Sequence, residues 1–64
     1  MYTLEVFYDG KADHTESLRS AAEVLARIPV LLEVHHGCER IVVRLDDARL
    51  FAVDCKGATL PRGA

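Results

Sequence analysis

The chain has 64 residues, of which 50% are hydrophobic, 28% are charged and 6% are aromatic, and its formal net charge is −2 at pH 7. A chain of this length forms one domain with a thin core, and this composition excludes an intrinsically disordered protein. The small acidic charge, with both signs interleaved along the chain, argues against a dedicated nucleic-acid or membrane-surface binder.

The first predicted element is a strand over residues 2–8. Its larger apolar side chains recur at every second position, as expected for a half-buried strand. Asp9 and Gly10 follow, and both residue types are typical of a tight turn. The strand is therefore expected to end there.

A helix is predicted over about residues 14–27. Asp13 and Glu16 stand three positions apart, which fits a reciprocal helix cap. Pro29 lacks a backbone N–H and disfavours helical geometry in the residue before it, so the helix is expected to end at this proline. One apolar stripe recurs at helical spacing and is formed by Leu18, Ala21, Ala22, Leu25 and Ile28.

Two strands are predicted after the helix, over residues 30–34 and 41–45. Both segments are rich in aliphatic side chains, and His36-Gly37 between them is the predicted hairpin turn. This register sets Glu33 opposite Arg40 and pairs aliphatic residues with one another. Favourable cross-strand pairs of this kind fix the register of a hairpin.

The last strand is predicted over residues 50–55, after a three-residue turn at 46–48. This register sets Arg40 opposite Asp54, whereas a two-residue turn would set Arg44 against Arg49. Like charges that face each other across two strands are destabilising, so the three-residue turn is preferred.

The resulting order is βαβββ. It indicates an α+β protein with a four-stranded mixed sheet and one helix packed on one face. Residues 1–57 are expected to form a single α+β domain, and 58–64 a flexible C-terminal tail. The predicted core contains the inward-facing residues Leu4, Val6, Leu18, Leu25, Ile41 and Val43.

The sheet face opposite the helix is predicted to carry an apolar patch with a charged rim. Phe7, Leu31 and Val42 are expected to point outward there, together with Leu50 and Ala52. Such a patch marks an interaction surface more often than scattered hydrophobic residues do. The predicted partner-binding residues are Phe7, Leu31, Glu33, Arg40, Val42 and Arg44.

A small metal-binding module at the turn from His35 to Cys38 is one alternative. His35, His36 and Cys38, with Asp54 and Cys55 across the predicted sheet, are side chains of the types that bind zinc. However, adjacent histidines of an extended strand point to opposite faces, and no Cys-x-x-Cys pair is present. The ordinary interpretation is two turn histidines and two small thiols, so no metal or cofactor is assigned.

A weak nucleic-acid binder through Arg40 and Arg44 is the other alternative. These two residues lie on one face of the predicted third strand, with Arg49 nearby. Glu33 and Asp54 flank them, so cross-strand ion pairing on a solvated sheet face explains the same pattern. We therefore treat nucleic acid as an unlikely partner.

No catalytic residues are assigned. A nucleophile at Cys38 would need an orienting group, an oxyanion hole and a pocket, and a thin core leaves little room for a pocket. The four glycines are scattered, so no phosphate-binding loop is present. The sequence therefore predicts a protein that is not an enzyme.

The predicted function is protein binding. We expect an adaptor or inhibitor that acts on a larger protein or complex through an exposed sheet face or edge. By size and charge the chain is comparable with phage-encoded or mobile-element inhibitors of bacterial complexes, which is an analogy alone. A homodimer is also expected, because a thin core and an exposed patch both favour a partner subunit.

The expected compartment is the cytoplasm. The chain opens with Met1-Tyr2-Thr3, without the basic and apolar regions of a secretory signal, and no apolar run approaches the ~18 residues of a membrane span. Two cysteines fall short of a secreted disulfide framework. Cys38 and Cys55 are therefore expected to remain thiols, and no membrane partner is expected.

Overall fold

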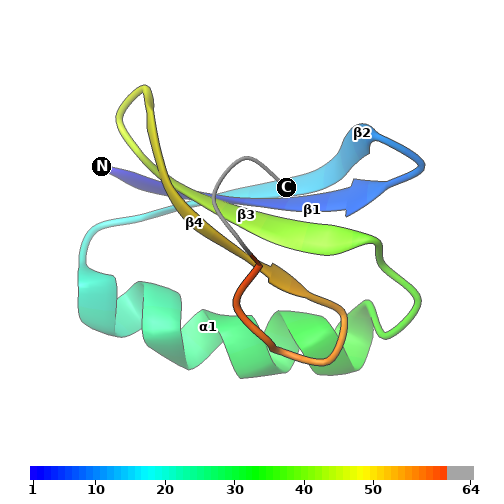
Figure 1. Cartoon of the computed structure of the whole chain (residues 1–64). Helices are drawn as coiled ribbons and strands as arrows, with labels where there is room; N and C mark the ends of the chain where they lie inside the picture. The colour runs from blue at the N-terminus through cyan, green and yellow to red at the C-terminus, as the bar shows by residue number, and fades with distance from the viewer. Residues whose placement is uncertain (61–64) are drawn as a thin grey trace.

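A computed structural model, which describes residues 1–60, has one helix and a four-stranded antiparallel sheet (Figure 1). The sheet order is β2-β1-β3-β4, and α1 lies under one face of the sheet. The predicted α+β class is confirmed. The predicted βαβββ order and mixed sheet are wrong, because the helix follows the second strand and all neighbouring strands are antiparallel. The elements are β1 (Tyr2–Tyr8), β2 (Lys11–Leu18), α1 (Ala21–Val34), β3 (Arg40–Leu45) and β4 (Ala48–Asp54).

The first half of the predicted helix is instead strand β2. Asp9 and Gly10 both have positive φ values, 50° and 78°, which is the backbone geometry of a two-residue hairpin turn. Glycine adopts this geometry without steric cost, and aspartate tolerates it better than most residues. The chain therefore reverses at Asp9-Gly10, and residues 11–18 pair with β1 rather than starting a helix.

Helix α1 begins at a different cap from the predicted one. The Ser20 hydroxyl accepts a hydrogen bond from the backbone N–H of Glu23 at 3.2 Å. The Glu23 carboxylate in turn accepts from the backbone N–H of Arg19 at 2.8 Å. These two bonds satisfy donors that a helix N-terminus leaves unpaired, and they place the first helical residue at Ala21.

Pro29 lies inside α1, so the predicted helix end at this residue is wrong. Its missing N–H leaves the carbonyl of Leu25 without a helical donor, but the helix continues to Val34. Residues 30–34 are therefore the end of the helix and not a strand. The predicted hairpin at 36–37 is also wrong, because β3 pairs with β1.

The second hairpin combines both registers considered from the sequence. Arg40 lies opposite Asp54, as predicted for the three-residue turn. The turn itself has two residues, so Arg44 lies opposite Arg49 near its tip. A register shift between positions 43 and 44 accommodates both pairings, which is the local irregularity that a β-bulge produces.

The hydrophobic core lies between α1 and the sheet. Four of the predicted core residues, on β1 and β3, are fully buried, and Leu18 packs at the periphery of the core. Leu25 is exposed, so its predicted core position is wrong. The helix instead directs other side chains at the sheet. The buried cluster contains Leu4, Val6, Val24, Leu31, Cys38, Ile41, Val43 and Val53.

The segment after β4 lies along the outer edge of that strand. The Asp54 carboxylate accepts hydrogen bonds from the backbone N–H groups of Lys56 and Ala58, both at 2.9 Å. The backbone N–H of Leu60 donates to the carbonyl of Ala52 at 2.8 Å. Residues 58–60 of the predicted tail are thus hydrogen bonded to β4, and 61–64 lie outside the described residues.

Candidate functional site

The structure separates the residues of the predicted partner-binding site. Phe7 on β1 and three residues of β3 share the sheet face away from the helix. Leu31 and Glu33 do not, because both lie on α1, where Leu31 points into the core and Glu33 into solvent. Their predicted position on the outer sheet face is therefore wrong, and the predicted residues that do lie on that face are Phe7, Arg40, Val42 and Arg44.

The outer sheet face is covered by its own charged side chains. Arg44 donates from Nε to the Glu5 carboxylate at 2.6 Å. The Arg40 guanidinium lies over the Phe7 ring, 4.3 Å from its centroid. Val42 is only 3% exposed between these groups. Val42 and Ala52, two residues predicted for the apolar patch, are thus buried, whereas Leu50 on β4 is 48% exposed.

The same contacts bear on the nucleic-acid alternative. Arg40 contacts both Phe7 and the Glu39 carboxylate, the latter at 3.0 Å, and Arg44 is bound to Glu5. A phosphate group would have to displace these acidic partners. The arrangement therefore gives no support to a strip of free cations along β3.

The exposed apolar surface lies on α1 instead. Leu25 is 64% exposed, Val34 66% and Val30 43%. Ala22 and Ala26 are exposed as well, and they lie between these larger residues on the side of the helix that faces away from the sheet. A surface helix normally turns charged residues to solvent, so this outer helix face is an unusual place for aliphatic side chains.

The outer helix face could have been found from the composition of the helix. The 14 residues of α1 contain only three charged side chains, Glu23, Arg27 and Glu33. One buried stripe cannot accommodate all the others, because a helix that packs on one sheet buries only one side. The sequence interpretation missed this surface because it ended the helix at Pro29.

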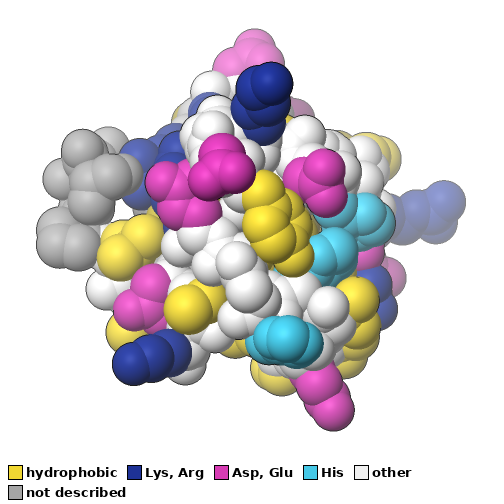
Figure 2. All heavy atoms as spheres, turned by 90° about the vertical axis from the view of Figure 1, so that its right-hand side faces the viewer, with side chains coloured by type: hydrophobic (Ala, Val, Ile, Leu, Met, Phe, Trp, Pro, Cys, Tyr) yellow, Lys and Arg dark blue, Asp and Glu magenta, His cyan; other side chains and the backbone are white. Residues whose placement is uncertain are grey.

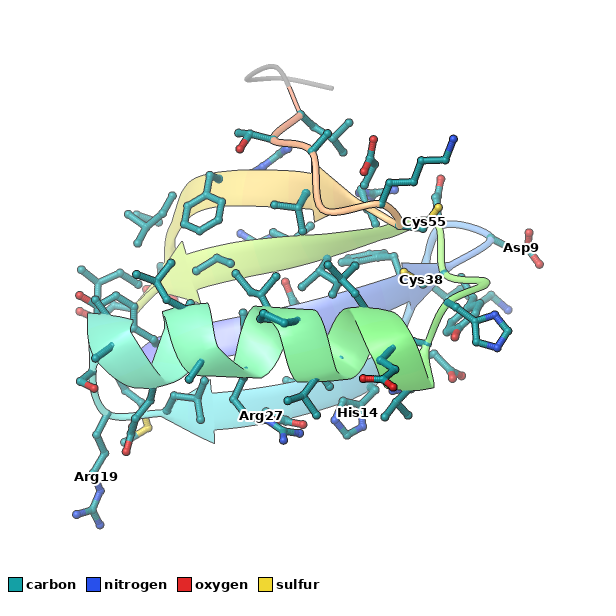
Figure 3. All side chains as sticks on the ribbon, turned by 90° about the horizontal axis from the view of Figure 1, so that it is seen from below. Asp9, His14, Arg19, Arg27, Cys38 and Cys55 are labelled. Carbon is teal, nitrogen blue, oxygen red and sulfur yellow. The ribbon has the colours of Figure 1, made fainter. Side chains whose placement is uncertain are left out.

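A polar cluster fills the space between α1 and the edge strand β2. The Glu16 carboxylate accepts hydrogen bonds from Arg27 at 2.8 and 2.6 Å, and it lies 2.7 Å from Nε2 of His14. The bidentate bond from Arg27 is the main cause of a Glu16 pKa of about 2, and His14 adds to it. Arg27 and His14 lie side by side under the helix (Figure 3). This cluster fastens α1 to β2.

The cluster continues to the C-terminal end of the helix. His35, the C-cap residue, has Nδ1 3.1 Å from the Tyr8 hydroxyl, and its ring centroid is 5.3 Å from that of His14. The pKa of Tyr8 is raised, mainly because burial disfavours the charged phenolate. Histidine side chains gather on this end of the molecule, beside acidic groups (Figure 2).

The predicted metal site at residues 35–38 is not assembled. His35 turns toward Tyr8, whereas Cys38 is buried in the core. Burial, with a smaller effect of nearby Cys55, raises the pKa of the Cys38 thiol. Within residues 1–60, no group of three or more histidine, cysteine or acidic side chains is arranged to hold a metal ion.

The two cysteines are free thiols in the structure. Cys38 and Cys55 lie near each other at the end of the sheet where β3 begins and β4 ends (Figure 3). A surface hollow of ≈ 530 Å³ lies elsewhere, along β4, and is lined by residues 48–51, Thr59 and Leu60. The hollow and the histidine cluster are therefore at opposite edges of the sheet and do not form one site.

Comparisons with protein-family models, with curated proteins and with solved structures found no match to this chain. In the part of the chain that the structure describes, no helix is both long and apolar enough to cross a bilayer. The outer helix face and the histidine cluster are thus the two features from which a function has to be argued.

Proposed function

We propose that this chain is a non-enzymatic protein-binding protein, an adaptor or inhibitor that docks onto a larger protein or complex through the outer face of α1. The observation that carries the proposal is the exposure of Leu25, Val30 and Val34 on one helix. A helix that lays an apolar face into a groove of its partner is a common mode of recognition. The proposal moves the docking surface from the sheet to the helix.

The histidine cluster supports binding over catalysis. His14 and Arg27 are both engaged with Glu16, and His35 is engaged with Tyr8. A catalytic base needs to reach a substrate atom, whereas these groups bond to one another and hold the helix on the sheet. Cys38, the candidate nucleophile considered from the sequence, is buried. Its pKa is raised, which disfavours the nucleophilic thiolate.

The size of the chain supports a class of partner, and its thiols support a compartment. A 7.1 kDa chain with one exposed apolar face suits an inhibitor that occludes a site on a larger complex, and phage or mobile-element inhibitors are one source of such proteins. We place the protein in the cytoplasm, because Cys38 and Cys55 are unpaired thiols.

A position-specific photo-crosslinking experiment tests this proposal. A photoreactive phenylalanine analogue is placed at Ala26, in the middle of the outer helix face, or at Thr15, an exposed control position on β2. After irradiation in the native cell, we expect an adduct heavier than two copies of the chain from position 26 and none from position 15. Replacing Val34 with lysine should reduce that adduct.

Two results would contradict the proposal. Equal adducts from both positions would mean that the helix face has no special role. Adducts containing only two copies of the chain would mean that no larger partner occupies it. A circular dichroism spectrum of each labelled protein checks that the fold is intact.

A further inference from the structure

His14 and His35 lie side by side although they come from different elements. His14 is on the edge strand β2, and His35 is the C-cap residue of α1. Their ring centroids are 5.3 Å apart, and the two ring planes are inclined by 32°. Figure 2 shows histidine side chains next to each other on the surface at this end of the molecule. The fold therefore pairs two imidazoles that are far apart in the sequence.

The hydrogen bonds around His14 determine which of its ring nitrogens carries the proton. Glu16 accepts two hydrogen bonds from the Arg27 guanidinium, at 2.8 and 2.6 Å, which is the contact of an ionised carboxylate. An ionised carboxylate has no proton to donate, so Nε2 of His14, 2.7 Å away, is the donor. In the neutral ring the lone pair is then on Nδ1, which has no hydrogen-bond partner within residues 1–60.

His35 is held in a similar way through its other ring nitrogen. Its Nδ1 lies 3.1 Å from the Tyr8 hydroxyl. A phenol accepts as well as donates hydrogen bonds, so this contact is kept when Nδ1 carries the proton and Nε2 the lone pair. In the described part of the chain, Nε2 has no hydrogen-bond partner. Each ring is thus anchored to an oxygen atom at one nitrogen and can offer the other nitrogen to a ligand.

Histidines that bind metal ions have this arrangement. The second ring nitrogen almost always donates to a carboxylate or another oxygen, which orients the ring and makes the ligating nitrogen more basic. Zn–N bonds are about 2.0–2.1 Å, so two imidazoles on one tetrahedral ion have their centroids about 5 Å apart. The observed 5.3 Å agrees with this separation. The His14 side chain is 40% exposed, so an ion can enter from solvent and water can complete its coordination.

We propose that Nδ1 of His14 and Nε2 of His35 bind one divalent transition-metal ion. Glu16 and Tyr8 are the positioning residues that orient the two rings. Imidazole suits zinc, copper and nickel, whereas magnesium and calcium take oxygen ligands. The site shares only one residue with the metal module predicted at residues 35–38. With two protein ligands it holds an exchangeable ion, and that ion links β2 to the C-terminal end of α1.

Calorimetric titration of the untagged protein with zinc chloride tests the site. The wild type should bind one equivalent. His14→Gln should weaken binding at least about tenfold, while the glutamine amide can still donate to Glu16. His35→Gln should have the same effect on binding, and it leaves the helix cap in place because that cap is a backbone hydrogen bond. His36→Gln, at an exposed position outside the pair, is the matched control and should bind zinc as the wild type does.

Several results would overturn the inference. One is a wild type that binds no zinc at about 1 mM. Another is equal affinity in the wild type and in both His14→Gln and His35→Gln. Cys55→Ser separates this site from a thiol site, because it should bind zinc as tightly as the wild type, and a loss of binding in it would place the ion elsewhere. Circular dichroism checks that each variant is folded.

Heteronuclear NMR of the imidazole nitrogens identifies the ligating atoms. Zinc should shift the resonances of His14 Nδ1 and His35 Nε2 most, because those two atoms change from a free lone pair to a metal bond. Zinc-induced shifts confined to His36 would overturn the inference. The outcome is independent of the photo-crosslinking at position 26, so either proposal can fail while the other stands.

Discussion

Neutralising Glu16 should destabilise the protein in a pH-dependent manner. In the folded protein, Arg27 and His14 lower the Glu16 pKa from its ordinary 4.5 to about 2. That difference corresponds to at most ~3.4 kcal/mol of folding free energy. The Arg27 and His14 side chains are 39% and 40% exposed, so solvent screening reduces the expected contribution to about 1–2 kcal/mol.

The sign of the pH dependence follows from the lowered pKa. A carboxyl group whose pKa is depressed by folding stabilises the folded state above its unfolded pKa, and this stabilisation disappears as the pH falls from about 5 toward 2. Glu16→Gln should therefore be less stable than the wild type at pH 7 by about 1–2 kcal/mol. Most of the difference should be lost by pH 2, because the Glu16 carboxyl group is then about half protonated in the folded protein and almost fully protonated in the unfolded chain.

Urea unfolding at a series of pH values, followed by circular dichroism, measures this difference. Contributions from the other carboxyl groups cancel when the two proteins are compared at the same pH. A constant difference between pH 7 and pH 2, or no difference at pH 7, would refute the role assigned to the Arg27–Glu16–His14 cluster. Arg27→Met should produce the same loss at pH 7 and add little to Glu16→Gln.

Three other outcomes are expected. Leu31→Ala should cost ~2–5 kcal/mol in thermal or urea unfolding because Leu31 is buried, whereas Leu25→Ala, measured on dilute monomer, should change stability by less than about 0.5 kcal/mol. If the two values are reversed, the helix orientation is wrong. Ser20→Ala removes the N-cap hydrogen bond and should lower the free energy of unfolding by ~0.5–2 kcal/mol in urea, and an unchanged stability would contradict the role assigned to this cap. A thiol reagent should modify Cys55 much faster than buried Cys38, and equal rates would contradict the packing at this end of the sheet.

The two central strands could be predicted from two different patterns. Residues 2–8 alternate in hydrophobicity, whereas 41–45 form a run of β-branched and aliphatic residues, and both predicted segments agree with the observed strands within one residue. The pairing of Arg40 with Asp54 was also predicted, since it places opposite charges together. Patterns of this kind are strong wherever one face of a strand is buried and the other is solvated.

The edge strand β2 could not be recognised by that rule. Its inward positions include His14 and Glu16, which bond to each other and to Arg27 rather than packing as hydrocarbon. The sequence does carry the competing signal, because Asp9-Gly10 after an alternating run is typical of a hairpin turn. Both Asp13 with Glu16 and Ser20 with Glu23 have the spacing of a helix cap. Because the hairpin places residues 11–18 in β2, the helix can begin only after Ser20.

The docking surface was misplaced for a related reason. Ending the helix at Pro29 turned Leu31 and Glu33 into strand residues and assigned them to the sheet face. In the structure the proline occupies an exposed helical position, where its ring is accommodated and a single hydrogen bond is lost. Tertiary packing of Val24 and Leu31 against the sheet outweighs that loss, and local rules do not contain this information.

The division of the sheet into two hairpins also determines how the chain can fold. β1–β2 and β3–β4 are joined by short turns, so each pair forms from residues that are close in sequence. The single non-local pairing is that of β1 with β3, in which Phe7 meets Arg40 and Tyr2 meets Leu45. Closing this loop carries most of the chain-entropy cost of assembly. We therefore expect the pairing of β1 with β3, across the connection formed by β2 and α1, to limit the rate of folding.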